Sequence, residues 1–230
     1  MVQKNQLNTK SIWLVSAVVV AIMLGFSAWA WQQVPAGASL PVHWNMAGEP
    51  DRYGGKFEGL LLLPLVAAGV AGIFTAIRYI DPLRANIERS GQAYRASLLG
   101  VLFVLLVIHI GAVLSALGYP INIGLIASPA IGIMFIVLGN YLGKIRRNYM
   151  FGVRTPWTLS SELAWNKTHR ITGKLFVAAG FLILVACLWG PIVAFYTMMI
   201  SILGTVAFAV IYSYLIWKQD PAMHTAPEAK

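Results

Sequence analysis

One polar segment of the chain, residues 143–173, contains Arg154, Glu162 and His169, whose side chains are of types that catalytic sites use. Glu162 and His169 could exchange protons with a substrate, and Arg154 could stabilise an anion. The sequence has no phosphate-binding glycine loop, paired-histidine zinc motif or nucleophile elbow. We therefore predict that the protein is not an enzyme, and a membrane enzyme built on these three residues stays open as an alternative.

A second polar segment, residues 32–59, contains His43 and Asp51, and both side chains can ligate a metal ion. Two candidate ligands without a recognised spacing fall short of the three or four that a zinc site needs. We expect no metal and no cofactor. The residues between them include the turn formers Asn45, Gly48 and Pro50, which predict a compact, hydrogen-bonded loop.

Two interpretations of this compact loop stay open. It is either an ordered loop resting on the membrane surface, with Trp44 and Tyr53 at the level of the lipid headgroups, or a surface that recognises a ligand. In the second case the candidate binding residues are His43, Trp44, Asn45, Gly48, Pro50, Asp51 and Lys56.

The composition requires lipid as the solvent for most of the 230 residues. The chain is 58% hydrophobic and only 11% charged, whereas soluble domains carry roughly 25% charged residues. Six apolar runs approach the roughly 20 residues needed to cross a bilayer. They are residues 11–31, 60–80, 96–117, 121–142, 175–189 and 192–217. We predict an all-α, polytopic integral membrane protein with six transmembrane helices in the lipid bilayer.

The basic residues predict how these helices are oriented. Arg52 and Lys56 lie in the first connection, and the other 15 of the 17 Lys and Arg residues lie on the opposite side of the predicted topology. These are Lys4, Lys10, Arg78, Arg84, Arg89, Arg95, Lys144, Arg146, Arg147, Arg154, Lys167, Arg170, Lys174, Lys218 and Lys230. The positive-inside rule places both termini and residues 143–173 in the cytoplasm, and residues 32–59 outside. Because topology explains the net charge of +9, we expect no direct nucleic-acid binding.

The first apolar run also has features of a secretory signal. Two lysines precede it, and Ala28-Trp29-Ala30 has the pattern of a cleavage site. The run exceeds the roughly 7 to 15 residues of a signal core, so we expect it to remain as the first span. Cleavage is the alternative, and it would leave the rest of the topology unchanged.

Apart from Arg78 at the end of the second run, His109 is the one plainly ionisable residue within the predicted spans. A polar group in lipid is costly, so we expect a polar partner or a water-filled cavity beside it. A hydrogen-bonded neutral imidazole and a functional proton carrier are both open. The spans contain no Asp or Glu, which argues against an ion-coupled transporter. A transporter or flippase for an amphipathic molecule remains the alternative function.

The second half of residues 143–173 has the pattern of a capped helix. Thr158 or Ser160 could cap its start, and Glu162 suits the first turn. We expect this helix to lie in the headgroup region, anchored by Trp157 and Trp165. Contact with anionic lipid is the preferred role of Lys144, Arg146 and Arg147. The candidate signalling or structural residues are Asn140, Arg154, Thr155, Pro156, Trp157, Glu162, Trp165, Asn166, His169 and Arg170.

Two Asp-Pro pairs, Asp81-Pro82 and Asp220-Pro221, each follow the end of a predicted span. Proline cannot continue a helix, because it lacks an N–H and its ring clashes with the preceding turn. Both pairs therefore predict a helix stop.

The motif Arg-Thr-Pro-Trp-Thr-Leu at residues 154–159, with Glu162, Trp165, Asn166 and His169-Arg170, closely resembles the SdpI family of bacterial membrane proteins. Gly139-Asn140 and residues 118–122 fit as well. Residues 41–56 are similar to a short domain of unknown function that often precedes the SdpI region. The resemblance implies an N-terminal two-helix region, residues 1–95, and an SdpI-like four-helix region, residues 96–230.

The resemblance also implies a function in the bacterial cell membrane. SdpI-type proteins confer immunity to a secreted peptide toxin, SdpC, and hold a cytoplasmic repressor, SdpR, at the membrane. Transferred to this sequence, residues 43–56 become a candidate toxin-facing surface and residues 154–170 a candidate signalling surface. An SdpC-like toxin and an SdpR-like repressor are therefore the expected partners.

Overall fold

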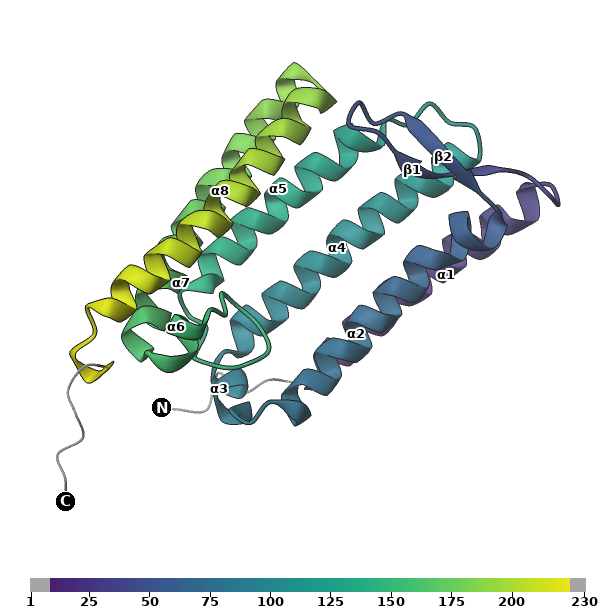
Figure 1. The fold of residues 1–230 in the computed structure, drawn as a ribbon. Coiled ribbons are helices and arrows are strands. Elements are labelled where there is room, and N and C mark those ends of the chain that lie inside the picture. The colour runs from purple at the N-terminus through teal and green to yellow at the C-terminus, as the bar shows by residue number, and fades with distance from the viewer. Residues whose placement is uncertain (1–8, 224–230) are drawn as a thin grey trace.

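The computed structural model describes residues 9–223, and six of its helices are long and apolar enough to cross a membrane. They lie in a row, with α7 and α8 at one edge and α1 and α2 at the other (Figure 1). The main helices are α1 (Thr9–Gln33), α2 (Leu62–Ile80), α4 (Gly91–Ala116), α5 (Ile123–Leu142), α7 (Glu162–Ala186) and α8 (Pro191–Lys218). The predicted all-α, polytopic membrane fold is confirmed.

Short elements lie at the two ends of the helices (Figure 1). A two-stranded antiparallel hairpin, β1 (Leu40–Trp44) and β2 (Pro50–Gly54), connects α1 to a π-helical turn (Phe57–Leu61) that begins the second span. We call this the hairpin end. The opposite end contains α3 (Arg84–Arg89), α6 (Pro156–Ser160) and a 3-10 turn, Pro221–Met223, after α8. Another 3-10 turn, Cys187–Trp189, follows α7.

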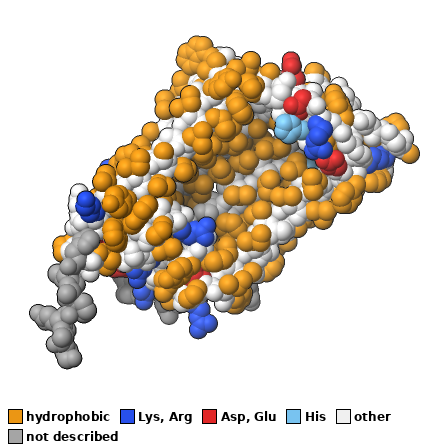
Figure 2. All heavy atoms as spheres, in the orientation of Figure 1, with side chains coloured by type: hydrophobic (Ala, Val, Ile, Leu, Met, Phe, Trp, Pro, Cys, Tyr) orange, Lys and Arg blue, Asp and Glu red, His pale blue; other side chains and the backbone are white. Residues whose placement is uncertain are grey.

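The surface of the helices is apolar, as lipid requires (Figure 2). Leu188 and Ile200, for example, are 81% and 71% exposed. Arg52 and Lys56 lie at the hairpin end, whereas the described basic side chains that were predicted to be cytoplasmic lie on α3, on the 143–161 connection or on the parts of α2, α4, α7 and α8 toward the opposite end, which we call the basic end. Lys4 and Lys230, which contributed to that prediction, lie outside the described residues.

Helices α5 and α7 form a close antiparallel pair through four glycines. A Cβ atom added to Gly139 would lie 2.5 Å from the carbonyl oxygen of Gly173, and one added to Gly180 would lie 2.5 Å from that of Gly132. Small residues permit such close approach of two backbones, which is the usual basis of helix packing in lipid. The two glycine contacts therefore join α5 and α7 into one unit.

Candidate functional site

The tip of the hairpin is a turn organised by Asn45. Its side-chain oxygen accepts hydrogen bonds from the backbone N–H groups of Ala47 (2.9 Å) and Glu49 (3.1 Å). Gly48 has a φ of +76°, in the left-handed region that favours glycine. Asn45 and Gly48 thus shape the turn.

This turn is fastened to the start of α5. The Asn122 amide donates to the carbonyl oxygen of Ala47 (2.8 Å), and its oxygen accepts from the N–H of Leu125 (3.1 Å), which caps α5. A Cβ on Gly48 would collide with the Asn122 side chain and would lie 2.7 Å from the backbone nitrogen of Gly124. The hairpin therefore sits directly on the helix that is packed against α7.

The other edge of the hairpin is tied to α1. The Lys56 ammonium donates to the carbonyl oxygen of Trp31 (2.9 Å) and lies 5.0 Å from the centre of the Trp31 ring. Trp44 is half-buried and pairs with Pro50 between the strands. Lys56, Trp44 and Pro50 therefore position the hairpin.

Two side-chain contacts remain on the exposed face of the hairpin. His43 Nδ1 lies 2.6 Å from Asp51 Oδ1, with the two side chains 63% and 42% exposed. Arg52 and Glu58 form the second pair, at 2.8 Å. Exposed pairs contribute only about 0–1 kcal/mol to stability, so this face is available for binding at little cost to the fold. Within residues 9–223 no three His, Cys, Asp or Glu side chains gather as a metal site would require.

At the basic end, the prediction of a separate surface helix in the second half of residues 143–173 is wrong. The helix α7 begins at Glu162 and continues without a break through the fifth span, which was expected to start between residues 173 and 175. The caps also differ from the predicted Thr158 and Ser160. Thr155 caps α6 in a capping box with Thr158, and Ser161 caps α7 by accepting from the N–H of Ala164 (2.9 Å).

Trp165 is not a headgroup anchor, because only 1% of it is exposed. Its ring stacks on that of His169, with centroids 4.1 Å apart, and its N–H donates to the carbonyl oxygen of Ile145 (2.7 Å). Trp157, the other expected anchor, is half-buried and contacts the ring of Tyr214 in α8. Both indoles therefore hold the 143–161 connection against the helices.

His169 is fully buried and uses both ring nitrogens. Nε2 accepts from the N–H of Val153 (2.9 Å), which requires the proton on Nδ1, and Nδ1 donates to the carbonyl oxygen of Trp165 (2.8 Å). Arg154 donates to the carbonyl oxygen of Tyr149 (2.7 Å), and Glu162 is exposed. Through these contacts His169 and Arg154 hold the 143–161 connection in place.

Two aspartates that had been predicted only as helix stops also hold this connection. Asp81 Oδ2 accepts from the N–H of Tyr149 (2.8 Å), and Asp220 Oδ2 accepts from the Ser161 hydroxyl (2.5 Å). Both aspartates are buried. Their Asp-Pro context indicated the helix ends, but nothing local in the sequence indicated the partners.

Asn148 was also missed. It is fully buried, and its side-chain oxygen accepts from the N–H groups of Met150 (2.9 Å) and Phe151 (2.8 Å). Its amide donates to the carbonyl oxygen of Arg146 (2.9 Å). The residues 143–161 thus form an ordered cover and not a free loop.

The remaining predicted residues of the basic end are exposed. Asn140 and Arg170 line a cavity of about 490 Å³ with Lys144 and Lys174. Asn166 lines a neighbouring cavity of about 360 Å³. Pro156 begins α6, where its missing N–H costs nothing.

His109 has the polar partner that was expected. It is fully buried, and Nε2 lies 3.1 Å from both Ser27 Oγ and the carbonyl oxygen of Met23. The Ser27 hydroxyl lies 2.5 Å from the carbonyl oxygen of Leu60 and donates to it. The site joins α1, the π-helical turn and α4.

The six apolar helices define a multi-pass membrane protein. Residues 144–216 match the SdpI/YfhL protein family, and residues 18–68 match a domain of unknown function, DUF1648. The predicted resemblance is therefore confirmed. The chain is 25% identical over 206 residues to the Immunity protein SdpI of Bacillus subtilis (strain 168). The aligned residues cover 90% of this chain and 96% of that protein. This homology supports a membrane immunity protein. No solved structure matches the chain.

Proposed function

We propose that this protein protects a bacterial cell from a secreted, SdpC-like peptide toxin, which it recognises at the exposed face of the hairpin. The observation that carries the proposal is the pairing of His43 with Asp51 on a hairpin whose tip is fixed to α5 by Asn122. An exposed polar face on a fixed support can bind without a large loss of chain entropy. The homology to an immunity protein supports the same function.

The distribution of positive charge supports an outward-facing hairpin. Among the described side chains, twelve Lys and Arg lie toward the basic end, and two lie at the hairpin end. The positive-inside rule then places residues 143–161 in the cytoplasm. A toxin arriving from outside would meet the hairpin first.

We further propose that toxin binding changes the cytoplasmic face and so controls an SdpR-like repressor. The route would run from the hairpin tip through α5 and its glycine contacts to α7, whose first turns hold Trp165 and His169 against the cover. A ligand can shift such a system only if it binds one arrangement more tightly than the other. Asn166 and Arg170 are exposed where a repressor would dock.

Toxin challenge of cells with the gene deleted and restored tests the function. Restoration with the wild type is expected to confer resistance, and His43→Ala/Asp51→Ala is expected to lose it at equal protein abundance. A matched control is Arg84→Ala/Glu88→Ala, which removes one cation and one anion from exposed positions at the opposite end. Deletion without any change in sensitivity to peptide toxins would contradict the proposal.

A further inference from the structure

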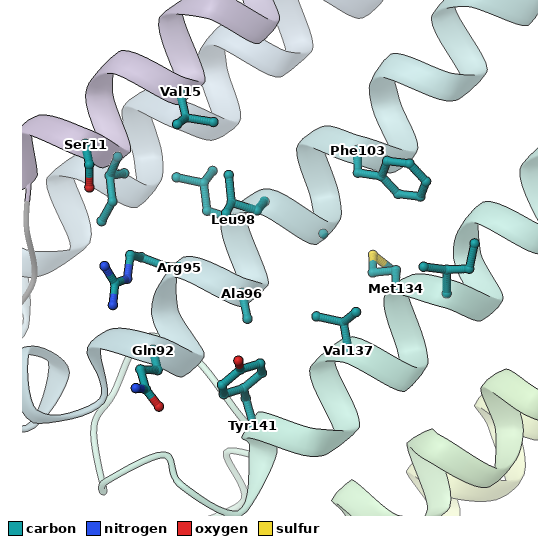
Figure 3. Close-up of a pocket in the computed structure, with 14 residues that line it drawn as sticks. Ser11, Val15, Gln92, Arg95, Ala96, Leu98, Phe103, Met134, Val137 and Tyr141 are labelled. Atoms are coloured by element: carbon teal, nitrogen blue, oxygen red, sulfur yellow. The ribbon is translucent and has the colours of Figure 1, made fainter. Parts of the chain in front are cut away.

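A lateral groove of about 640 Å³ lies between α1, α4 and α5 near the basic end (Figure 3). Its volume is within the roughly 300–1,000 Å³ typical of small-molecule sites. Its walls are mainly apolar, and several wall residues are exposed on the lipid-facing surface. These are Val15, Leu99, Phe103, Ile133 and Val137. The groove is therefore open to the hydrocarbon region, where an acyl chain is the molecule available to fill it.

The groove is polar at one end only. Figure 3 shows Gln92, Arg95 and Tyr141 where α4 begins and α5 ends, with Phe103 and Met134 farther along. Arg95 is one turn from the start of α4, so it lies roughly 6 Å from the end of the helix, and Phe103 lies roughly 12 Å deeper. This order, cation at the membrane surface and apolar residues below, matches the polarity of a lipid molecule.

A second cavity, of about 360 Å³, continues from the polar end. Gln92 lines both cavities, and the Lys144 ammonium lies 4.8 Å from the centre of the Tyr141 ring, which lines the groove. This cavity contains the cations Arg89, Lys144 and Arg146 and no carboxylate.

No carboxylate forms an ion pair with Arg89, Arg95 or Arg146 in the described part of the chain. Arginine and lysine at such positions are the usual ligands of phosphate. Charge complementarity therefore favours an anionic occupant over a zwitterionic or cationic one.

We propose that the two cavities together form a binding site for one anionic glycerophospholipid. The phosphate headgroup lies among Arg89, Lys144 and Arg146, and one acyl chain lies in the groove between α4 and α5. The site is distinct from the hairpin face, so the proposal is independent of toxin recognition. Because Arg89 of α3, Gln92 of α4 and Asn166 of α7 all line the headgroup cavity, the bound lipid also links these three helices.

Native mass spectrometry of the full-length protein, released from nanodiscs of phosphatidylglycerol or phosphatidylcholine, tests the site. The wild type is expected to retain one phosphatidylglycerol and no phosphatidylcholine. Arg89→Gln/Lys144→Gln/Arg146→Gln is expected to weaken retention about a hundredfold, since each surface cation contributes about fivefold. The control Arg84→Gln/Lys167→Gln/Lys218→Gln removes the same charge outside both cavities and is expected to retain the lipid.

A second pair of variants tests the groove. Val137→Trp fills it and is expected to release the lipid, whereas Val185→Trp, on the lipid-facing side of α7, is expected to keep it. If a triple variant fails to fold, the single change Arg146→Gln replaces it, with Arg84→Gln as control. Equal retention of both lipids, equal loss in the control, no retained lipid in the wild type, or full retention by Val137→Trp would each overturn the proposal.

Discussion

The indole of Trp165 and the imidazole of His169 stack with their ring centroids 4.1 Å apart, and each ring also binds a different part of the 143–161 cover. Trp165 donates to Ile145, and His169 accepts from Val153. One turn of α7 therefore fixes the cover at two points eight residues apart. The spacing of four residues on α7 therefore places both rings where they hold the cover.

Replacing His169 with Ala is expected to lower the free energy of unfolding by about 1–3 kcal/mol, because the Val153 N–H loses its acceptor in a partly buried position. Thermal unfolding in detergent measures the effect. Lys167→Ala, at an exposed position two residues earlier, is expected to change stability by less than about 0.5 kcal/mol. Equal unfolding midpoints for the two variants would show that the ring does not hold the cover.

Replacing Asp81 with Ala is expected to loosen the cover while α2 persists. The N–H groups of Leu83 and Tyr149 both lose their acceptor, at a cost of about 1–3 kcal/mol. Limited proteolysis should then cut residues 143–161 faster than in the wild type. Glu88→Ala, an exposed carboxylate on α3, is the control and is expected to leave the cleavage rate unchanged. Cleavage of Asp81→Ala at the wild-type rate would contradict this role.

A methyl group at Gly139 is expected to force α5 away from α7. The added Cβ would lie 2.5 Å from the Gly173 oxygen, and overpacking of this kind costs about 1–3 kcal/mol. Gly139→Ala should therefore lower the unfolding midpoint. Gly69→Ala in α2, where no atom lies within 4 Å of the new Cβ, is expected to be neutral or stabilising. A midpoint for Gly139→Ala at or above that of Gly69→Ala would disprove the close contact.

His109 distinguishes the immunity proposal from the transporter alternative. The imidazole is packed among Ser27, Met23 and the helices around them, so we expect its role to be structural. His109→Ala is expected to reduce stability but to leave toxin resistance unchanged at equal abundance of folded protein. Loss of substrate movement in reconstituted vesicles, caused by this substitution alone, would favour the transporter.

The six spans were predictable from hydropathy because each is a continuous apolar run, and the positions of the helix stops followed from the Asp-Pro pairs. The burial of the Trp165 side chain was not predictable, since tryptophan near a membrane surface is more often an anchor. Its burial depends on Ile145 and His169, and Ile145 belongs to a different segment. The long range of that contact left no local signal.

The contact between α5 and α7 did have a signal in the sequence, the spacing of its glycines, which a hydropathy profile does not detect. Gly132 and Gly139 are seven residues apart, as are Gly173 and Gly180, so each pair lies on one helix face, two turns apart. The hairpin is the opposite case. Asn45 and Gly48 predicted its turn, but its attachment to Asn122 depends on a connection far along the chain.

Accessibility of two engineered cysteines tests the central claim, that the hairpin faces outward and the cover faces the cytoplasm. Cys187, the one cysteine of the chain, is first replaced by Ser, and His43→Cys and Asn166→Cys are then introduced separately at exposed positions. On intact spheroplasts, a membrane-impermeant maleimide is expected to label position 43 at once and position 166 only after lysis. Labelling of position 166 before lysis, with position 43 protected, would contradict the account.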